Sequence, residues 1–267
     1  MDRKIGIYSW FGVMLPMEDR LRKIKKAGFD STMLWWGDKV AFWDFDKEDL
    51  VKKTEEIGLV IENIHLPYND INNLWEKSIS SRKLVDDYKG WIRDCKDYNI
   101  GGAVIHLEHD NYLVDSTDYG FKNLYEIIDY AEGMGVDIAV ENTMNTEILR
   151  KVLNCFDSKH LKFCYDSSHD WVVCENPGEL ILEFGNRLKY LHLSDNDMEK
   201  DRHWIPGTGK VDWNIVAENF SKIGFEGNIS FEVCPFDFSG TAEEVLSSTY
   251  GFGVDLNNKI KDNGRSI

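Results

Sequence analysis

Long apolar runs are missing from this sequence of 267 residues. No stretch approaches the ~18 uninterrupted apolar residues that a membrane-spanning helix needs. The first residues, MDRKIGIYSW, contain no apolar segment typical of an export signal. Proline is scarce at five residues, whereas 42% of the residues are hydrophobic and 13% are aromatic. This balance disfavours disorder and predicts a folded, soluble protein without a membrane partner or an export signal.

Signals for cysteine pairing are missing as well. The five cysteines form an odd set, and no Cys-x-x-Cys spacing occurs among them. A disulfide framework and a thiolate zinc site are therefore both disfavoured. We expect reduced cysteines and a cytoplasmic location.

The sequence also lacks a concentrated run of basic residues. Lys and Arg total 31 against 47 Asp and Glu, which gives a formal net charge of −16. Such a chain repels polyanions, so nucleic acid is a disfavoured partner but not an excluded one. A small anionic substrate stays compatible, because metal ions in an acidic cleft would reverse the local potential. The sequence leaves the oligomeric state open.

Eight short β-branched or aromatic runs alternate with longer segments of helical period, which predicts repeated βα units around a parallel sheet. The predicted strands are 4–10, 29–36, 59–66, 102–107, 136–142, 161–166, 188–194 and 228–233. Four of the helices before strands end in KKAGFD, EEIGLV, EGMGVD and SKIGFE, where glycine supplies a left-handed terminal residue. Eight such units predict an α/β fold with a single (β/α)₈ barrel, and we place one domain over residues 1–267.

Six consecutive predicted strands end in a histidine or a carboxylate. These residues are His65, His106, Glu141, Asp166, His192 and Glu232. In such a barrel the active site lies at the carboxyl ends of the strands. One residue of this kind is more often a hydrogen-bonded structural group, but converging carboxylates would raise their own pKa values unless cations neutralised them. Imidazole with carboxylate suits Zn²⁺ or Mn²⁺, so we predict a divalent metal site at this end of the barrel.

Three further candidate ligands lie just beyond the strand ends: His169, Asp201 and His203. A solvated polar loop is the alternative interpretation of this set. Five of the seven histidines nevertheless fall among the nine candidates, which favours the ligand interpretation. We therefore expect roughly one to three metal ions per chain.

Aromatic and basic residues near the strand ends are candidates for substrate contacts. Trp10 and Trp36 are the last residues of two predicted strands. At such positions an aromatic face can stack on the apolar side of a sugar ring, and core packing is an equal alternative. Trp35 and Trp204 occupy similar places in the chain. Arg202 is a candidate partner for an anionic substrate group, and a solvated surface position is equally compatible.

Seven ordered segments resemble the xylose isomerase-like TIM barrel superfamily, which includes sugar isomerases, sugar and ketose 3-epimerases, inosose dehydratases and metal-dependent AP endonucleases. The segments are NIHLPY (63–68), VIHLEH (104–109), VEN (140–142), YDSSH (165–169), YLHLSDN (190–196), DRHWIPGTGKVDW (201–213) and FEV (231–233). The resemblance covers essentially the whole chain.

Two branches of that superfamily imply different sites. In the isomerase and epimerase branch, one metal is held by positions resembling Glu141, Asp166, His192 and Glu232, and the two glutamates also move the substrate proton. In the endonuclease branch a trinuclear zinc centre uses nine ligands, and each has a matching residue among the nine candidates. Tyr68 resembles a residue that the endonucleases use near DNA, which makes it a further substrate-binding candidate.

Two segments favour the first branch. The loop after the second strand, WWGDKVAFWDFDKED, is acidic and tryptophan-rich where the endonucleases carry a basic segment, and it would meet phosphates poorly. The segment PGTGKVDW (206–213) is closer to the isomerase and epimerase pattern P-G-x-G-x-x-D-aromatic.

The resemblance thus implies a metal-dependent isomerase or epimerase acting on a sugar, sugar phosphate or related polyol. Glu141 and Glu232 would serve as base and acid at a carbon next to a metal-polarised carbonyl. A trinuclear-zinc phosphodiester hydrolase and a metal-binding barrel without turnover are the alternatives. The sequence does not assign the base and the acid between the two glutamates.

Overall fold

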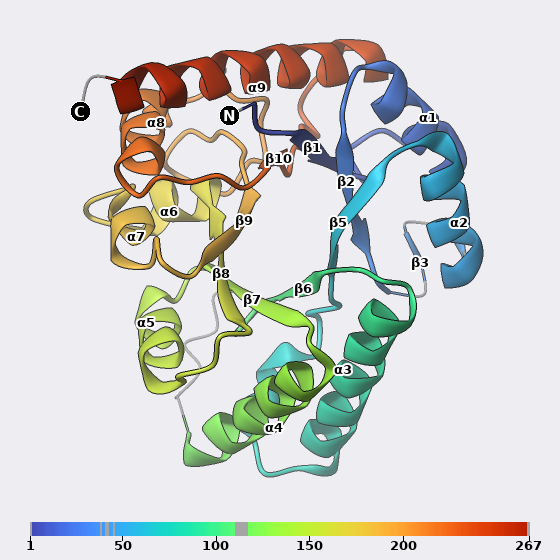
Figure 1. The fold of residues 1–267 in the computed structure, drawn as a ribbon, viewed down its shortest axis with the longest axis vertical. Coiled ribbons are helices and arrows are strands. Elements are labelled where there is room, and N and C mark those ends of the chain that lie inside the picture. Colours follow the sequence, from blue (N-terminus) through green and yellow to red (C-terminus); the bar gives the residue numbers. More distant parts are fainter. Residues whose placement is uncertain (1, 38, 41–42, 45, 110–116, 266–267) are drawn as a thin grey trace.

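The computed structural model describes residues 2–37, 39–40, 43–44, 46–109 and 117–265, and it is a parallel barrel surrounded by helices (Figure 1). The strands are β1 (Ile5–Tyr8), β2 (Ser31–Trp35), β5 (Val60–His65), β6 (Gly102–Ile105), β7 (Asp137–Glu141), β8 (Leu161–Asp166), β9 (Leu188–His192) and β10 (Ile229–Phe231). They pair in the order β10-β1-β2-β5-β6-β7-β8-β9, and a parallel bridge between Leu193 and Phe231 brings the two ends of the sheet together. The predicted (β/α)₈ barrel is confirmed.

Helices follow the strands and cover the outside of the barrel (Figure 1). They are α1 (Met17–Lys26), α2 (Lys47–Ile57), α3 (Ile79–Asp97), α4 (Asp118–Met134), α5 (Thr146–Cys155), α6 (Ser167–Val173), α7 (Glu179–Glu183), α8 (Trp213–Lys222) and α9 (Ala242–Arg265), with a 3-10 turn η1 (Ile71–Trp75). Each long helix turns an apolar stripe inward, as Leu21 and Ile24 do in α1. Within the described ranges, no helix has both the length and the apolar character that crossing a bilayer requires.

The helix-ending glycines have the backbone conformation that the sequence predicts. Gly58 closes α2 with φ of 84°, and Gly135 closes α4 with φ of 71°. Gly28 and Gly224 in the other two motifs also have positive φ. Because an L side chain is strained at these angles, glycine sets the point where the chain leaves a helix for the next strand.

The loop after β2 contains an element that the sequence did not predict. Two short strands, β3 (Lys39–Val40) and β4 (Trp43–Asp44), pair antiparallel there. The barrel strands are also shorter than predicted at several ends, since β1 stops at Tyr8 and β2 at Trp35. Strand-forming residues continue past the last barrel pairing, which is why the pattern alone overestimates the strand length.

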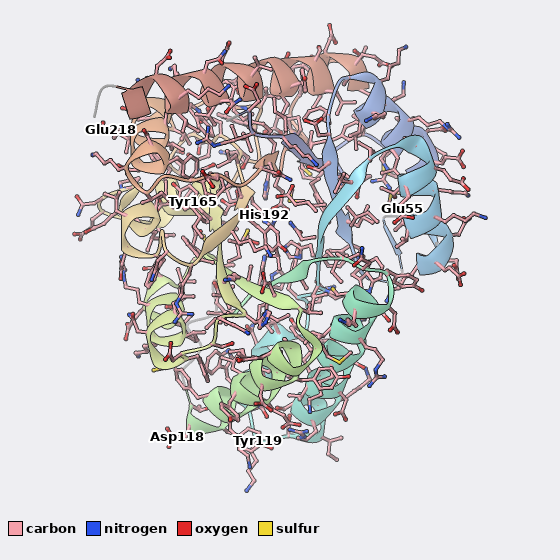
Figure 2. All side chains as sticks on the ribbon, viewed as in Figure 1. Glu55, Asp118, Tyr119, Tyr165, His192 and Glu218 are labelled. Atoms are coloured by element: carbon pink, nitrogen blue, oxygen red, sulfur yellow. The ribbon has the colours of Figure 1, made fainter. Side chains whose placement is uncertain are left out.

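The barrel interior has a small apolar layer directly below the strand ends. Val104, Ala139, Cys164 and Tyr190 from four neighbouring strands form this layer. The larger hydrophobic core lies between the strands and the surrounding helices. Figure 2 shows His192 near the middle of the molecule, whereas Glu55, Asp118 and Glu218 lie at its periphery.

Candidate active site

Strand alternation aims the strand-end residues into the mouth of the barrel. Successive side chains of a strand point to opposite faces, so residues two positions apart share a face. The residues two positions beyond the inner layer are His106, Glu141, Asp166 and His192. His65 on β5 and Glu232 after β10 contact this group from the other side. Five of the six are buried, and the Glu232 side chain is 15% exposed.

The carboxylate of Glu141 is the centre of the group. Its Oε2 lies 3.4 Å from Nε2 of His65 and 3.4 Å from Nε2 of His106. The same oxygen lies 2.9 Å from Nδ1 of His192, and Oε1 lies 3.4 Å from Nδ1 of His169. Burial opposes ionisation, but the charges of His192 and His106 hold the pKa of Glu141 well below its usual range. Glu141 is therefore a buried anion among four imidazoles.

His192 connects the two glutamates. Its Nδ1 lies 2.8 Å from Oε2 of Glu232 and 2.9 Å from Oε2 of Glu141. Burial would raise the pKa of Glu232, but the nearby charge of His192 lowers it to about 2. Asp166 is the last residue of the group. Burial raises its pKa to about 7. Its Oδ1 accepts the backbone N–H of His169 at 2.7 Å.

Asp201 links the remaining candidates. Its Oδ2 lies 3.3 Å from Nε2 of His169 and 2.8 Å from Nε2 of His203, and Oδ1 accepts a 2.6 Å hydrogen bond from Ser168 Oγ. Burial lowers the pKa of His203, but Asp201 raises it to about 10. His203 has a left-handed backbone with φ of 48°, an uncommon conformation for a non-glycine residue that is frequent at functional sites.

The structure thus brings all nine predicted ligands into one connected group, which we call the barrel-mouth cluster. Its members are His65, His106, Glu141, Asp166, His169, His192, Asp201, His203 and Glu232. The residues of a single-metal site, Glu141, Asp166, His192 and Glu232, place one ligand atom each within 4.8 Å of one another. Their assignment as ligands stays a prediction.

The donor set fits a divalent ion. Both carboxylate oxygens of Glu141, Oδ2 of Asp166 and both ring nitrogens of His192 are buried without a hydrogen-bond partner. Buried polar atoms in proteins almost always have a partner. Ligand atoms that share one ion at bond lengths of about 2.1 Å stand about 3.0–3.4 Å apart, close to the 2.8–3.5 Å measured in the cluster.

The family described as xylose isomerase-like TIM barrel matches residues 21–248 of this chain. The chain belongs to this family. Fructoselysine 3-epimerase of Escherichia coli O157:H7 is 26% identical over 253 residues, which cover 86% of this chain and 90% of that protein. The crystal structure of a D-tagatose 3-epimerase-like protein superposes with a TM-score of 0.79 at 22% identity, covering 97% of this chain and 98% of the other.

A D-allulose 3-epimerase from Methylomonas sp., solved in complex with D-allulose, superposes with a TM-score of 0.74 at 15% identity. The match covers 95% of this chain and 97% of that one. At such identities the structural comparisons establish the shared fold.

Two aromatic side chains, Tyr68 and Trp35, pack against histidines of the barrel-mouth cluster. Tyr68 stacks on His106 with ring centroids 4.3 Å apart and an interplanar angle of 9°. Trp35 stacks on His65 at 5.8 Å and meets Tyr68 edge-on at 5.4 Å. Burial is the main cause, and the negative charge of Glu232 the second, that raises the pKa of Tyr68 to about 12. The candidate Tyr68 therefore lies against two predicted ligands.

Trp36 requires a correction as a substrate-binding candidate. Its side chain is completely buried, and its indole N–H donates a 2.8 Å hydrogen bond to Asp94 of α3. It packs edge-on against Tyr98 and lies under the ammonium group of Lys47. Successive side chains of an extended chain point to opposite faces. Trp35, the last residue of β2, therefore faces the barrel mouth beside His65, and Trp36 faces the helices.

The other two substrate candidates, Trp10 and Arg202, have local partners. The Arg20 guanidinium lies 5.0 Å from the Trp10 ring centroid, and Cys234 Sγ donates to the Trp10 carbonyl at 3.1 Å. Trp10 is half-buried beside the segment that follows Glu232. Arg202 forms two hydrogen bonds to Oδ2 of Asp197, at 2.9 and 2.7 Å, so its charge is already engaged by a carboxylate.

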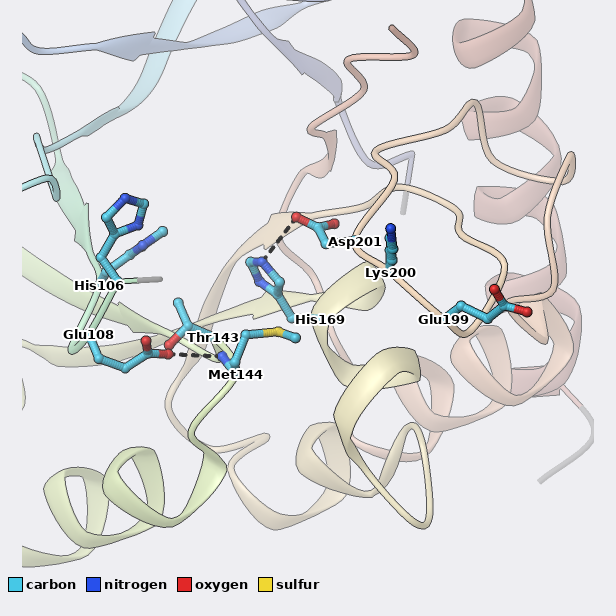
Figure 3. Close-up of a pocket in the computed structure, with 9 residues that line it drawn as sticks. His106, Glu108, Thr143, Met144, His169, Glu199, Lys200 and Asp201 are labelled. Atoms are coloured by element: carbon cyan, nitrogen blue, oxygen red, sulfur yellow. Dashed lines mark hydrogen bonds and ion pairs between the residues drawn. The ribbon is translucent and has the colours of Figure 1, made fainter. Parts of the chain in front are cut away.

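Two residues at the site were missed by sequence reasoning. Tyr8, at the end of β1, lies 6.5 Å from His65 by ring centroids, and burial followed by the Glu232 charge raises its pKa well above the usual range. Glu108 lines a 380 Å³ pocket together with His106 and His169 (Figure 3). Inspection of only the last strand residues passed over both, because Tyr8 was inside a longer predicted strand and Glu108 lay beyond one.

Proposed function

We propose that this chain is a divalent-metal-dependent isomerase or epimerase that acts on a sugar. The proposal is carried by the four ligand atoms of Glu141, Asp166, His192 and Glu232, which lie within 4.8 Å of one another at the active-site end of the barrel. A relative that is named a fructoselysine 3-epimerase supports a small carbohydrate as the substrate.

The four residues would hold one ion, which when bound supplies Lewis-acid polarisation of a carbonyl and a neighbouring hydroxyl. Glu141 and Glu232 approach Nδ1 of His192 from separate strands. Their lowered pKa values keep both carboxylates ionised at neutral pH. One of them accepts a proton from the carbon next to the carbonyl. The other, after taking a proton from solvent water, delivers that proton to the opposite face and so inverts the carbon, and the first glutamate then releases its proton to solvent.

The rest of the barrel-mouth cluster gives the second candidate function its support. Asp201 between His169 and His203, with His65 and His106 on Glu141, makes a donor set larger than one ion requires. We propose that these residues bind additional ions when supply is ample. A trinuclear-zinc phosphodiester hydrolase would use such a set, but its substrate is a polyanion and this chain carries a net charge of −16.

Deuterium exchange tests the reaction. Ketoses incubated with metal-loaded protein in deuterated water should acquire deuterium at the carbon next to the carbonyl, visible by NMR, because the proton passes through Glu141 or Glu232. A phosphodiesterase never breaks a C–H bond. Cleavage of an abasic DNA duplex, without deuterium incorporation into any sugar tested, would overturn the proposal in favour of the hydrolase.

A further inference from the structure

The residue that follows Glu141 joins the ends of β7 and β8 through its side chain. Asn142 is fully buried, and its Nδ2 donates a 2.7 Å hydrogen bond to the backbone carbonyl of Asp166. Its Oδ1 accepts the backbone N–H of Asp166 at 2.7 Å. A side-chain amide has the same donor and acceptor as a peptide group. Asn142 therefore continues the β7–β8 pairing past its last strand pair, Glu141 with Cys164.

Ser167 repeats this arrangement at the next pair of strands. It follows Asp166 at the end of β8 and is fully buried. Its Oγ donates a 2.8 Å hydrogen bond to the carbonyl of Ser194 and accepts the backbone N–H of Ser194 at 3.0 Å. Ser194 lies two residues beyond His192, the last residue of β9. Two buried side chains thus bridge three neighbouring strands at the level of the barrel-mouth cluster.

These contacts leave one carboxylate oxygen of Asp166 without a partner. Both backbone groups of Asp166 bind Asn142, and Oδ1 accepts the backbone N–H of His169 at 2.7 Å. Oδ2 is buried and has no hydrogen-bond partner among the described residues. Asp166 is therefore held at three of its polar atoms, and Oδ2 stays available for an ion.

The exact place of Asp166 matters for metal binding, because carboxylate oxygens bind Zn²⁺ within a narrow range of about 2.0–2.2 Å. Without the Asn142 amide, the backbone N–H and carbonyl of Asp166 would be buried without a partner, which costs free energy. The end of β8 would shift to reduce that cost, and the Asp166 carboxylate would move with it. Loss of the Ser167 hydroxyl would act in the same way on the spacing of β8 and β9.

We propose that Asn142 and Ser167 are positioning residues that hold Asp166 between Glu141 and His192 for binding of one ion. Neither belongs to the nine predicted ligands. The inference rests on the proposed function for the presence of the ion, and its own content is that two residues outside the ligand set determine the affinity for that ion.

Calorimetric titration of chelator-treated protein with Mn²⁺ alone tests the inference. We expect Asn142→Ala to raise the Kd for Mn²⁺ by about tenfold or more, the size typical for loss of a residue that orients a ligand. Ser167→Ala removes only a hydroxyl and should raise the Kd roughly threefold or more. Because it is the milder change, it tests the bridges even if Asn142→Ala does not fold. An unchanged Kd in either folded variant would refute the role of that residue.

Matched controls separate positioning from a general contribution to stability. Asn123 of α4 and Ser81 of α3 are also buried, and Nδ2 of Asn123 donates a 2.8 Å hydrogen bond to Oγ of Ser81. Asn123→Ala and Ser81→Ala should lower the Tm of the metal-free protein and leave the Kd for Mn²⁺ unchanged. A purely structural role of Asn142 and Ser167 would give this same result. Equal weakening of Mn²⁺ binding by the controls would refute the positioning role.

Deuterium exchange into ketoses separates failure of the inference from failure of the proposed function. Weaker Mn²⁺ binding in the Asn142 and Ser167 variants, without exchange in the unmodified protein, would support the inference while the proposed reaction failed. Exchange in the unmodified protein with an unchanged Kd in both variants would support the proposed reaction and reject the inference. Unmodified protein that binds neither Mn²⁺ nor Zn²⁺ would overturn both.

Discussion

Nδ1 of His192 lies 2.9 Å from Oε2 of Glu141 in the mouth of the barrel, and neither atom has a hydrogen-bond partner. A buried imidazole and a buried carboxylate this close would ordinarily align into a hydrogen bond. Two ligand atoms directed at one ion adopt this spacing without alignment. The spacing of His192 and Glu141 therefore fits two ligand atoms of one ion.

Metal addition should stabilise the folded protein. At a concentration about 100 times the Kd, Mn²⁺ or Zn²⁺ should raise the Tm of chelator-treated protein by roughly 5–10 °C, because only the folded chain assembles the ligands. His192→Ala should abolish the increase measured by differential scanning fluorimetry. His160→Ala removes a histidine that pairs with Asp137 away from the cluster and should preserve it. An unchanged Tm in the unmodified protein would contradict the metal site.

Glu232→Gln should lose turnover while retaining metal. The amide keeps the shape and an oxygen donor but cannot take a proton, so we expect kcat to fall by roughly 10²–10⁴. Steady-state assays on the best ketose, paired with elemental analysis, measure both properties. Glu226→Gln is the control, because Glu226 is exposed to solvent and lies shortly before β10 in the chain. Near-normal kcat in Glu232→Gln would show that Glu232 carries no proton.

His169 and His203 should determine how many ions bind. With ample metal, the unmodified protein should hold more than one ion per chain, and the double variant His169→Ala, His203→Ala should hold fewer. Asp201 loses both imidazole neighbours in that variant, which removes a donor set on this side of the cluster. Elemental analysis after gel filtration gives the stoichiometry. Identical metal content would mean that these two residues are not ligands.

Trp35 and Trp36 should respond oppositely to replacement by alanine. Trp36→Ala should cost about 3–5 kcal/mol in the free energy of unfolding with little change in KM, because the side chain is fully buried away from the site. Trp35→Ala should raise KM for the ketose roughly three- to tenfold by removing an aromatic surface beside His65. Urea unfolding and steady-state kinetics of both variants test this contrast. A large KM change in Trp36→Ala alone would contradict it.

Glu126 should make stability fall at acid pH. Hydrogen bonds from Arg82 and then Lys89 lower the pKa of Glu126 from its ordinary 4.5 to about 2. Since the folded pKa is the lower one, this contribution is complete above the unfolded pKa and disappears as pH falls towards 2. The stability difference between the unmodified protein and Glu126→Gln should thus be larger near pH ~6 than near pH ~3. Equal differences in urea unfolding at both pH values would contradict this.

Much of the barrel and its candidate ligands follows from local sequence patterns. Strand and helix periods are properties of short segments, and glycines such as Gly58 mark helix ends through their own backbone freedom. Parallel strands of one barrel end at the same rim, so Glu141 and His192 are expected to meet before any contact is known. The sequence therefore determined the eight strands and which residues gather at their ends.

Only the tertiary structure decided which neighbouring side chains face the site. Trp35 and Trp36 are adjacent in the chain and equally aromatic, yet one lies against His65 and the other against Asp94. The outcome depends on the register of β2 against β5, which shifts between Thr32 and Met33. Because strand faces alternate with every residue, a one-residue uncertainty in strand end or register reverses the assignment, and only the paired strands remove it.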